Sequence, residues 1–313
     1  MSATTNPGPT TPSSFAAPPE SQGLAGLIYV ALAVGLFSTS PVFIRWAAPL
    51  SSFEITFGRM IVAAVAVGLL ARLPGVGWSA GEANRRPGLA DAPRFALYGL
   101  IAALHFLLYI ASLSYTTIAH SLSLVYTAPV FVTLFTSLIL KERIHRRKWL
   151  GLPVVIAGIA VLAGFEPRFD SRMLFGDLLA VGSAVCFGLY SVAGRRERSR
   201  FGLLDYASTV YFAAAIWLLP AALVGASGAA ILPSSLPAIG AVVFLGVVPL
   251  AIGHTLYNAS LRRVHPTYVN LVSTQEVTGG ILLGFLLLGE VPGVSSLVGA
   301  GLSLIGVALV LLL

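Results

Sequence analysis

The sequence predicts an all-α membrane protein: ten transmembrane helices that form two inverted five-helix repeats around a central cavity. Three observations lead to this expectation, namely an apolar composition, ten long apolar segments and an internal repeat. Of the 313 residues, 57% are hydrophobic and only 10% are charged. A soluble core cannot use that much apolar surface, whereas a lipid bilayer accommodates it.

Ten segments have the length and composition of membrane-spanning helices. A helix needs about 20 apolar residues to cross the hydrocarbon core, and its backbone groups must be bonded within the same segment. Residues 1–23 precede the spans and are rich in Pro, Ser and Thr, so we expect a disordered cytoplasmic tail there. The expected spans are residues 24–46, 52–72, 95–114, 118–140, 149–165, 175–194, 203–225, 236–258, 266–288 and 294–313.

Two stretches of the chain repeat each other at a separation of 148 residues. Residues 109–158 overlay residues 257–306 without a gap. We therefore expect a first five-helix repeat over residues 24–165 and a second over residues 166–313. Because each repeat has an odd number of spans, the second begins on the opposite side of the membrane, and the halves must be inverted. Internal repeats in a chain this apolar are typical of transporters.

Basic residues are distributed unevenly among the loops. With the amino terminus inside, fifteen lysines and arginines fall in inside loops, against Arg168 and Arg172 outside and Arg45 near an outer helix end. This positive-inside pattern places both termini in the cytoplasm. It also explains the net charge of +7 without a nucleic-acid partner. The expected partners are the lipid bilayer and a small-molecule substrate, with a monomer as the working expectation for an oligomeric state that the sequence leaves open.

The motifs of common enzymes and of nucleotide sites are missing. The sequence has no His-Glu-x-x-His pair, no Gly-x-x-x-x-Gly-Lys loop and no Gly-x-Ser-x-Gly elbow. Its five histidines are scattered and its single cysteine has no partner. We therefore expect no catalytic residues, no metal site, no cofactor and no enzymatic activity. Without a nucleotide site, any active transport would be secondary.

Each half ends with a similar pattern. A helix that ends at Glu142 or Glu290 is followed by a helix whose glycines are spaced by seven. We expect these glycines to lie in close helix contacts, namely Gly151, Gly158, Gly299 and Gly306. This pattern resembles the EamA-type repeat of the drug/metabolite transporter superfamily, in which the position of Arg59 often holds an arginine. The resemblance implies a bundle of ten helices in which the third, fourth, eighth and ninth line a central cavity.

Within that superfamily the chain is similar to bacterial exporters of amino acids, and the aromatic-amino-acid exporters are the first choice. The resemblance implies a secondary transporter in the bacterial cytoplasmic (inner) membrane that exports amino acids or related small metabolites by alternating access. Two alternatives stay open. One is a facilitator or channel-like uniporter, and the other is an efflux protein of broad specificity for drugs or metabolites.

Polar residues share faces on the four helices that the resemblance places around the cavity. A phenol near mid-membrane needs a hydrogen-bond partner, and its ring can stack on an apolar or aromatic solute. Packing remains an alternative, because small residues let backbones approach and hydroxyls can bond back to their own helix. The expected substrate-binding residues are Tyr109, Tyr126, Tyr257, His105, Ser123, Thr274 and Glu276.

Glu276 is the only carboxylate near the middle of an expected span. A charge at the bilayer centre costs at least about 2.5–3.5 kcal/mol on insertion scales, so this group must be paired, protonated or open to water. It either binds a substrate amine or couples protons, or it is a neutral carboxyl bonded to a neighbouring helix. Glu142, Glu290 and Arg59 are expected to be gating or structural groups.

Overall fold

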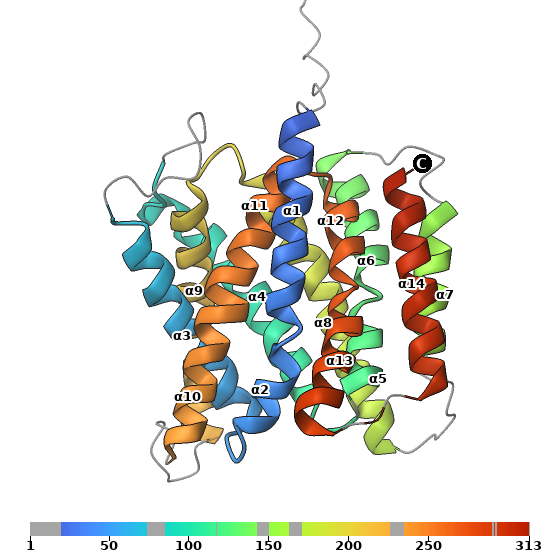
Figure 1. The fold of residues 1–313 in the computed structure, drawn as a ribbon. Helices are drawn as coiled ribbons and strands as arrows, with labels where there is room; N and C mark the ends of the chain where they lie inside the picture. The colour runs from blue at the N-terminus through green and yellow to red at the C-terminus, as the bar shows by residue number, and fades with distance from the viewer. Residues whose placement is uncertain are drawn as a thin grey trace, which may run out of the picture.

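The computed structural model describes residues 20–73, 85–116, 118–142, 150–162, 171–225, 235–289, 291 and 293–312. Within these ranges the regular structure is helical, and no strand occurs. Eight helices of the described chain are long and apolar enough to cross a membrane. They stand side by side as a bundle, and α1 begins at the same end at which the chain finishes (Figure 1). We call this the upper end and the opposite one the lower end.

The described helices are named in chain order. A 3₁₀ turn (Leu89–Asp91) precedes α4, and two π-helical segments, η2 (Thr136–Leu140) and η4 (Gly246–His254), follow α6 and α10. The α-helices are α1 (Glu20–Phe37), α2 (Ser40–Trp46), α3 (Ser52–Leu70), α4 (Ala92–Ser112), α5 (Ile118–Val125), α6 (Ala128–Phe135), α7 (Gly151–Leu162), α8 (Ser171–Arg196), α9 (Leu203–Gly225), α10 (Leu236–Leu245), α11 (Thr255–Arg263), α12 (Pro266–Ser273), α13 (Glu276–Leu288) and α14 (Val294–Leu312).

Three spans that the sequence predicts as continuous helices are broken within the bundle. The breaks separate α1 from α2 at Thr39, α5 from α6 at Thr127, and α12 from α13 at Thr274. At each break the threonine hydroxyl donates to the carbonyl three residues earlier, at 2.6, 2.7 and 2.7 Å respectively. These bonds satisfy carbonyls that lose their helical partner inside the bundle.

Proline accounts for two of the three breaks. Pro41 and Pro129 lie in the first turn of α2 and α6. A proline has no N–H to donate to the preceding turn, and its ring clashes with the carbonyl four residues earlier. The break before α13 has no proline. It matches the break between α5 and α6 in the repeat, because Tyr126 and Thr274, the first residues after α5 and α12, are 148 residues apart.

Helices α7 and α14 pack with closely spaced backbones. A Cβ atom on Gly158 would lie 2.4 Å from the nitrogen of Ser303, and one on Gly306 would lie 2.5 Å from the nitrogen of Val155. Only glycine permits this approach, so the expected role of the two glycines is confirmed. Within the described residues α7 and α14 count as shorter apolar helices beside the eight long ones, so ten spanning helices remain a prediction.

Candidate functional site

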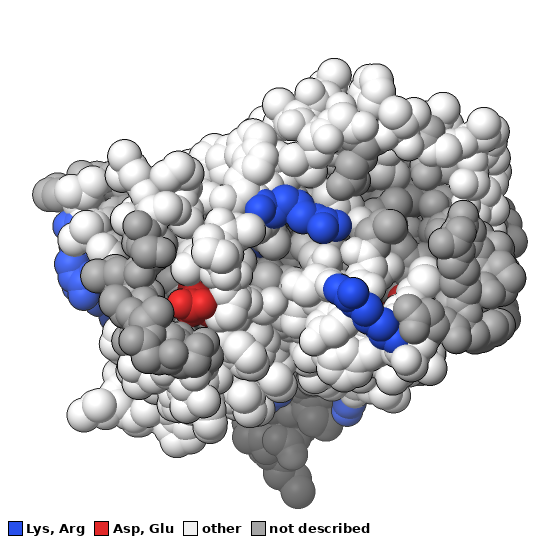
Figure 2. Space-filling model, turned by 90° about the horizontal axis from the view of Figure 1, so that it is seen from below, with Lys and Arg blue, Asp and Glu red and all other residues white. Residues whose placement is uncertain are grey.

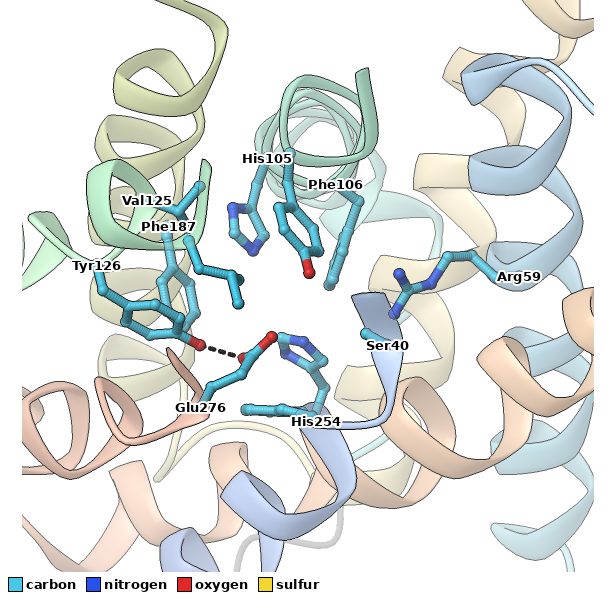
Figure 3. A pocket seen from close by; sticks show the side chains of 12 residues that line it. Ser40, Arg59, His105, Phe106, Val125, Tyr126, Phe187, His254 and Glu276 are labelled. Carbon is cyan, nitrogen blue, oxygen red and sulfur yellow. Dashed lines mark hydrogen bonds between the residues drawn. The ribbon is translucent and has the colours of Figure 1, made fainter. Parts of the chain in front are cut away.

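A narrow pocket with a cavity volume of about 20 Å³ lies inside the bundle, where the helix breaks meet. Its walls combine the break between α1 and α2 with residues from α3, α4, α5, α8, η4 and α13, so both halves of the sequence contribute (Figure 3). The lining residues are Phe37, Ser40, Arg59, His105, Phe106, Tyr109, Leu122, Val125, Tyr126, Phe187, His254 and Glu276.

Glu276 enters the pocket from the first turn of α13, directly after a break. A helix amino terminus favours negative charge at this position. The Glu276 carboxylate accepts a hydrogen bond from the hydroxyl of Tyr126, which lies at the matching break between α5 and α6. Only 6% of Glu276 is exposed. The two repeat-related breaks thus meet through one hydrogen bond, and the carboxylate is held there by a neutral donor.

Arg59 is the only arginine among the lining residues, and no lysine lies among them. Ser51 and Glu54 form a capping box that fixes the start of α3, and Arg59 follows little more than one helical turn after Glu54. Its side chain is 1% exposed, and its Nε and Nη1 atoms have no hydrogen-bond partner. The guanidinium carbon lies 4.9 Å from the ring centroid of Phe106. In the described chain no carboxylate forms an ion pair with it.

Two histidines bring flat rings to the wall. The His105 ring stacks on Phe187 with centroids 4.6 Å apart and an interplanar angle of 9°, and its Nδ1 lies 2.9 Å from the Ser183 hydroxyl. His254 packs against Phe37 at a centroid distance of 4.3 Å. The pocket therefore presents aromatic faces together with one guanidinium and one carboxylate.

Several buried polar atoms at this site lack a partner. They are Nε and Nη1 of Arg59, the hydroxyl of Tyr109 and Nδ1 of His254. Buried polar atoms are hydrogen-bonded in the large majority of cases. Unpartnered polar atoms on three residues of one pocket wall indicate a place that is suited to receive a polar solute or water.

The structure brings together a part of the residue set that the sequence predicts. Tyr109, Tyr126, His105 and Glu276 all line the pocket. Arg59, expected from the sequence to be a gating or structural group, lies in the same wall. The first two tyrosines approach from α4 and from the end of α5, as Figure 3 shows for the labelled Tyr126.

The other expected binding residues lie behind the wall. The Tyr257 hydroxyl is 2.6 Å from that of Ser191 and accepts a hydrogen bond from the Asn270 amide at 2.9 Å. Thr274 uses its hydroxyl for the backbone bond at the break, and Ser123 is buried without lining the pocket. A role for these three in binding stays a prediction.

Sequence reasoning missed the contributions of Phe37, Phe187 and His254. It considered only the third, fourth, eighth and ninth spans, whereas the pocket also draws on α1, α3 and α8. It also assumed regular α-helical spacing through the eighth span. The π-helical η4 contains Pro249 and shifts the rotation of the helix, so that His254 faces the pocket. That proline was the available signal.

A cluster of charged groups ties helices together at the upper end, and we call Glu142, Arg195 and Arg198 the upper latch. The Glu142 carboxylate lies 3.2 Å from Nη2 of Arg195 and 3.4 Å from Nη1 of Arg198. Arg195 also donates to the carbonyl of Leu261 at 2.9 Å. The latch thus joins the end of η2 to α8 and α11. Glu290, its expected counterpart, falls outside the described residues.

His265 lies beside the latch, in the connection between α11 and α12. Burial lowers the pKa of His265 to about 4, although the nearby Glu142 carboxylate opposes this shift. A folded-state pKa this low keeps the imidazole neutral near pH 7. His265 therefore adds no positive charge to the latch at that pH.

The lower face differs from the upper one. Seen from below, its middle is recessed, and basic side chains lie beside the recess (Figure 2). Every ion pair between described residues lies at the upper end, on the connections and helix ends around α4, α8 and α9. Among the described residues, ion pairs between side chains are therefore concentrated on one side of the pocket.

Comparisons with known proteins agree with this architecture. The model of the EamA-like transporter family matches residues 24–164 and 174–312. A probable terminal-alkyne amino-acid exporter of Streptantibioticus cattleyicolor is 30% identical over 82% of each chain. The pseudopaline exporter CntI of Pseudomonas aeruginosa is 28% identical over 88% of this chain and 92% of its own.

The fold also occurs among solved structures. One crystal structure matches with a TM-score of 0.71 at 20% identity and covers 94% of this chain and 97% of its own. At that identity the match shows the fold alone. The family match, by contrast, extends over nearly all of the described bundle. This chain is a multi-pass membrane protein that belongs to the EamA-like transporter family.

Proposed function

We propose that the protein is a secondary transporter that exports amino acids or related small metabolites across the cytoplasmic membrane by alternating access. The pocket is the observation that carries this proposal. It lies where two repeat-related helix breaks meet, and both halves of the chain contribute to its wall. Discontinuous helices around a site at the interface of two repeats are a common construction in secondary transporters.

Ten spanning helices in two inverted repeats are part of the proposal. The pairing of the helices supports it, because α3 packs on α9 and α7 on α14. These are the second with the seventh and the fifth with the tenth expected spans. In addition, α4 packs on α8 and α1 on α11, which are the third with the sixth and the first with the eighth expected spans. Exchanging the two halves of the chain turns the first of these pairings into the second. This is the pattern that a pseudo-two-fold axis produces.

The upper end is proposed to face the cytoplasm, in accordance with the positive-inside rule. In that orientation the upper latch closes the pocket toward the cytoplasm, and the recessed lower face is external. The basic residues of the described chain at the upper end are Arg72, Arg85, Arg86, Arg94, Lys141, Arg195, Arg196, Arg198, Arg200, Arg262 and Arg263.

The substrate class follows from the wall and the relatives together. The printed names of two relatives are those of an amino-acid exporter and a pseudopaline exporter. The rings of Phe37, Phe106, Tyr109 and Phe187 offer stacking surfaces. Aromatic amino acids are therefore the favoured substrates within the amino-acid class.

Counterflow in proteoliposomes tests the proposal. Vesicles that contain the purified protein are preloaded with unlabelled L-phenylalanine, L-tyrosine, L-leucine or glucose, and uptake of the same labelled compound is measured. We expect amino acids to accelerate uptake on preloading, flux to saturate, and the aromatic compounds to give the lowest half-saturating concentrations. Protein-free vesicles are the control.

The alternatives give different outcomes. Flux that rises linearly with concentration and ignores preloading indicates a facilitator or channel. Exchange of cationic dyes as rapid as that of amino acids indicates broad-specificity efflux. Exchange of glucose alone contradicts the proposed substrate class.

A further inference from the structure

The pocket wall contains an arginine and a glutamate that form no ion pair with each other. Arg59 on α3 and Glu276 on α13 approach it from different sides, with His254 drawn between them in Figure 3. No ion pair within 4.0 Å joins them. The first residue belongs to the first half of the chain and the second to the other half.

Arg59 has the surroundings of a binding group. A buried charge is costly unless it is paired and hydrogen-bonded, yet two of its guanidinium nitrogens have no partner. The ring of Phe106 offers only a cation–π contact, and the Tyr109 hydroxyl beside the pocket is itself unpartnered. A planar guanidinium with free N–H groups matches a carboxylate, which it can bind through two parallel hydrogen bonds.

Glu276 has complementary surroundings. Its described partner is the Tyr126 hydroxyl, so no cation neutralises it. An ammonium group can take the place of that hydroxyl or bind beside it, and a charge-assisted bond is the stronger one. The Tyr126 hydroxyl then either stays bonded to the Glu276 carboxylate or rotates away from it.

We infer that Arg59 and Glu276 bind the carboxylate and the ammonium of one zwitterionic α-amino acid. This inference rests on the proposed function and narrows its substrate class. The aromatic wall holds the side chain, while the two charges select the backbone end. Because the charges belong to different halves, a bound amino acid links the halves that must move during transport.

The pair predicts a double selectivity. A ligand that lacks the carboxylate leaves Arg59 unpaired, and one that lacks the amine leaves Glu276 without its cation. Sites built around such groups strongly reject analogues that cannot satisfy them. We expect phenethylamine and 3-phenylpropanoate each to compete at least about tenfold less well than L-phenylalanine.

Competition for counterflow in proteoliposomes is the test, with L-phenylalanine and its two analogues as probes. Arg59→Met should raise the half-saturating concentration of L-phenylalanine at least about tenfold and remove its advantage over phenethylamine. Arg59→Lys should retain part of the affinity for L-phenylalanine and part of its advantage over phenethylamine. Glu276→Gln should instead remove the advantage over 3-phenylpropanoate. The same comparison is made without an aromatic ring by using leucine, its analogue without the carboxylate (3-methylbutan-1-amine) and its analogue without the amine (4-methylpentanoate).

Arg72→Met is the matched control. Arg72 follows the end of the same helix, donates to the carbonyl of Gly68 at 2.7 Å and is not among the lining residues of the pocket. Its replacement should leave both preferences unchanged. Thermal unfolding gives a readout that does not need transport. Arg59→Met should melt no lower than the wild type without ligand and should lose the stabilisation by L-phenylalanine, because a ligand stabilises only the state that binds it.

The outcomes separate the inference from the proposed function. If the wild type exchanges no amino acid, the inference is wrong, and so is the amino-acid part of the proposed function. If it exchanges amino acids but either analogue competes as well as L-phenylalanine, the inference is overturned and the transporter stands. Identical selectivity changes in Arg59→Met and Glu276→Gln would show that the two side chains merely pair with each other, which also overturns it.

Discussion

Two tyrosines in matching repeat positions, Tyr109 and Tyr257, differ in what their hydroxyls contact. The first hydroxyl is unpartnered, whereas the second is bonded to Ser191 and Asn270. Tyr257→Phe should lower the free energy of unfolding by about 1–3 kcal/mol, because it removes two buried hydrogen bonds. Tyr109→Phe should have almost no effect. Thermal unfolding of the detergent-solubilised protein measures both, and equal losses of stability would contradict this assignment.

At the same scale, the sequence predicted that certain buried polar side chains require a hydrogen-bond partner, but it did not predict which residue that partner is. It showed that Glu276 requires a partner near mid-membrane, and the structure supplies Tyr126 from another expected span. It could not place Arg59 in the pocket, because sequence periodicity does not give the rotation of α3 relative to its neighbours. Residues that meet across helices depend on packing, and packing is decided by many side chains at once.

At the scale of the element, helix existence was easier to predict than helix continuity. Pro41 and Pro129 were available signals for two breaks. The break at Thr274 had no such signal, and a threonine within a helix usually bonds back to its own helix without breaking it. The close approach of α7 and α14 was predictable, because glycines at a spacing of seven repeat on one helix face.

The upper latch leads to a prediction about helix opening. Glu142→Gln removes the negative charge that holds Arg195 and Arg198, whose side chains are 11% and 20% exposed. A loss of about 1 kcal/mol shifts the balance toward the open state roughly fivefold. A cysteine introduced by Ser260→Cys on the buried face of α11, in a Cys186→Ala background, should then react faster with a water-soluble maleimide.

Asp205→Asn is the control for the latch, because it breaks an ion pair with Arg86 at the same end whose side chains are 27% and 69% exposed. Exposed pairs contribute little, so the labelling rate should not change. The effect of Glu142→Gln should also be equal at pH 6 and pH 8, since His265 stays neutral over this range. If the Glu142→Gln variant reacts with the maleimide at the same rate as the parent protein, Glu142 has no role in gating.

At the scale of the whole molecule, composition and the repeat predicted a helical membrane bundle, which the structure and the family match confirm. The pocket could be predicted only in part. Its wall depends on where three helices break and on a π-helical segment. Phe37 lies at one of these breaks and His254 ends the π-helical segment, so regular helical spacing does not place either residue in the wall. Global architecture follows from average properties of the chain, whereas the site follows from local departures from them.

Orientation is the remaining property of the whole molecule, and it leads to the last prediction. The basic side chains gather at the end where α1 begins and the chain finishes, and positively charged loops stay in the cytoplasm. A reporter that is active only outside should therefore be silent when fused after Lys148, Arg200 or Leu313. It should be active when fused at Arg168 or Ser234, and a fluorescent reporter that matures only inside should give the opposite pattern. The reversed result would place the latch on the external side, so that the pocket described here would be closed toward the outside.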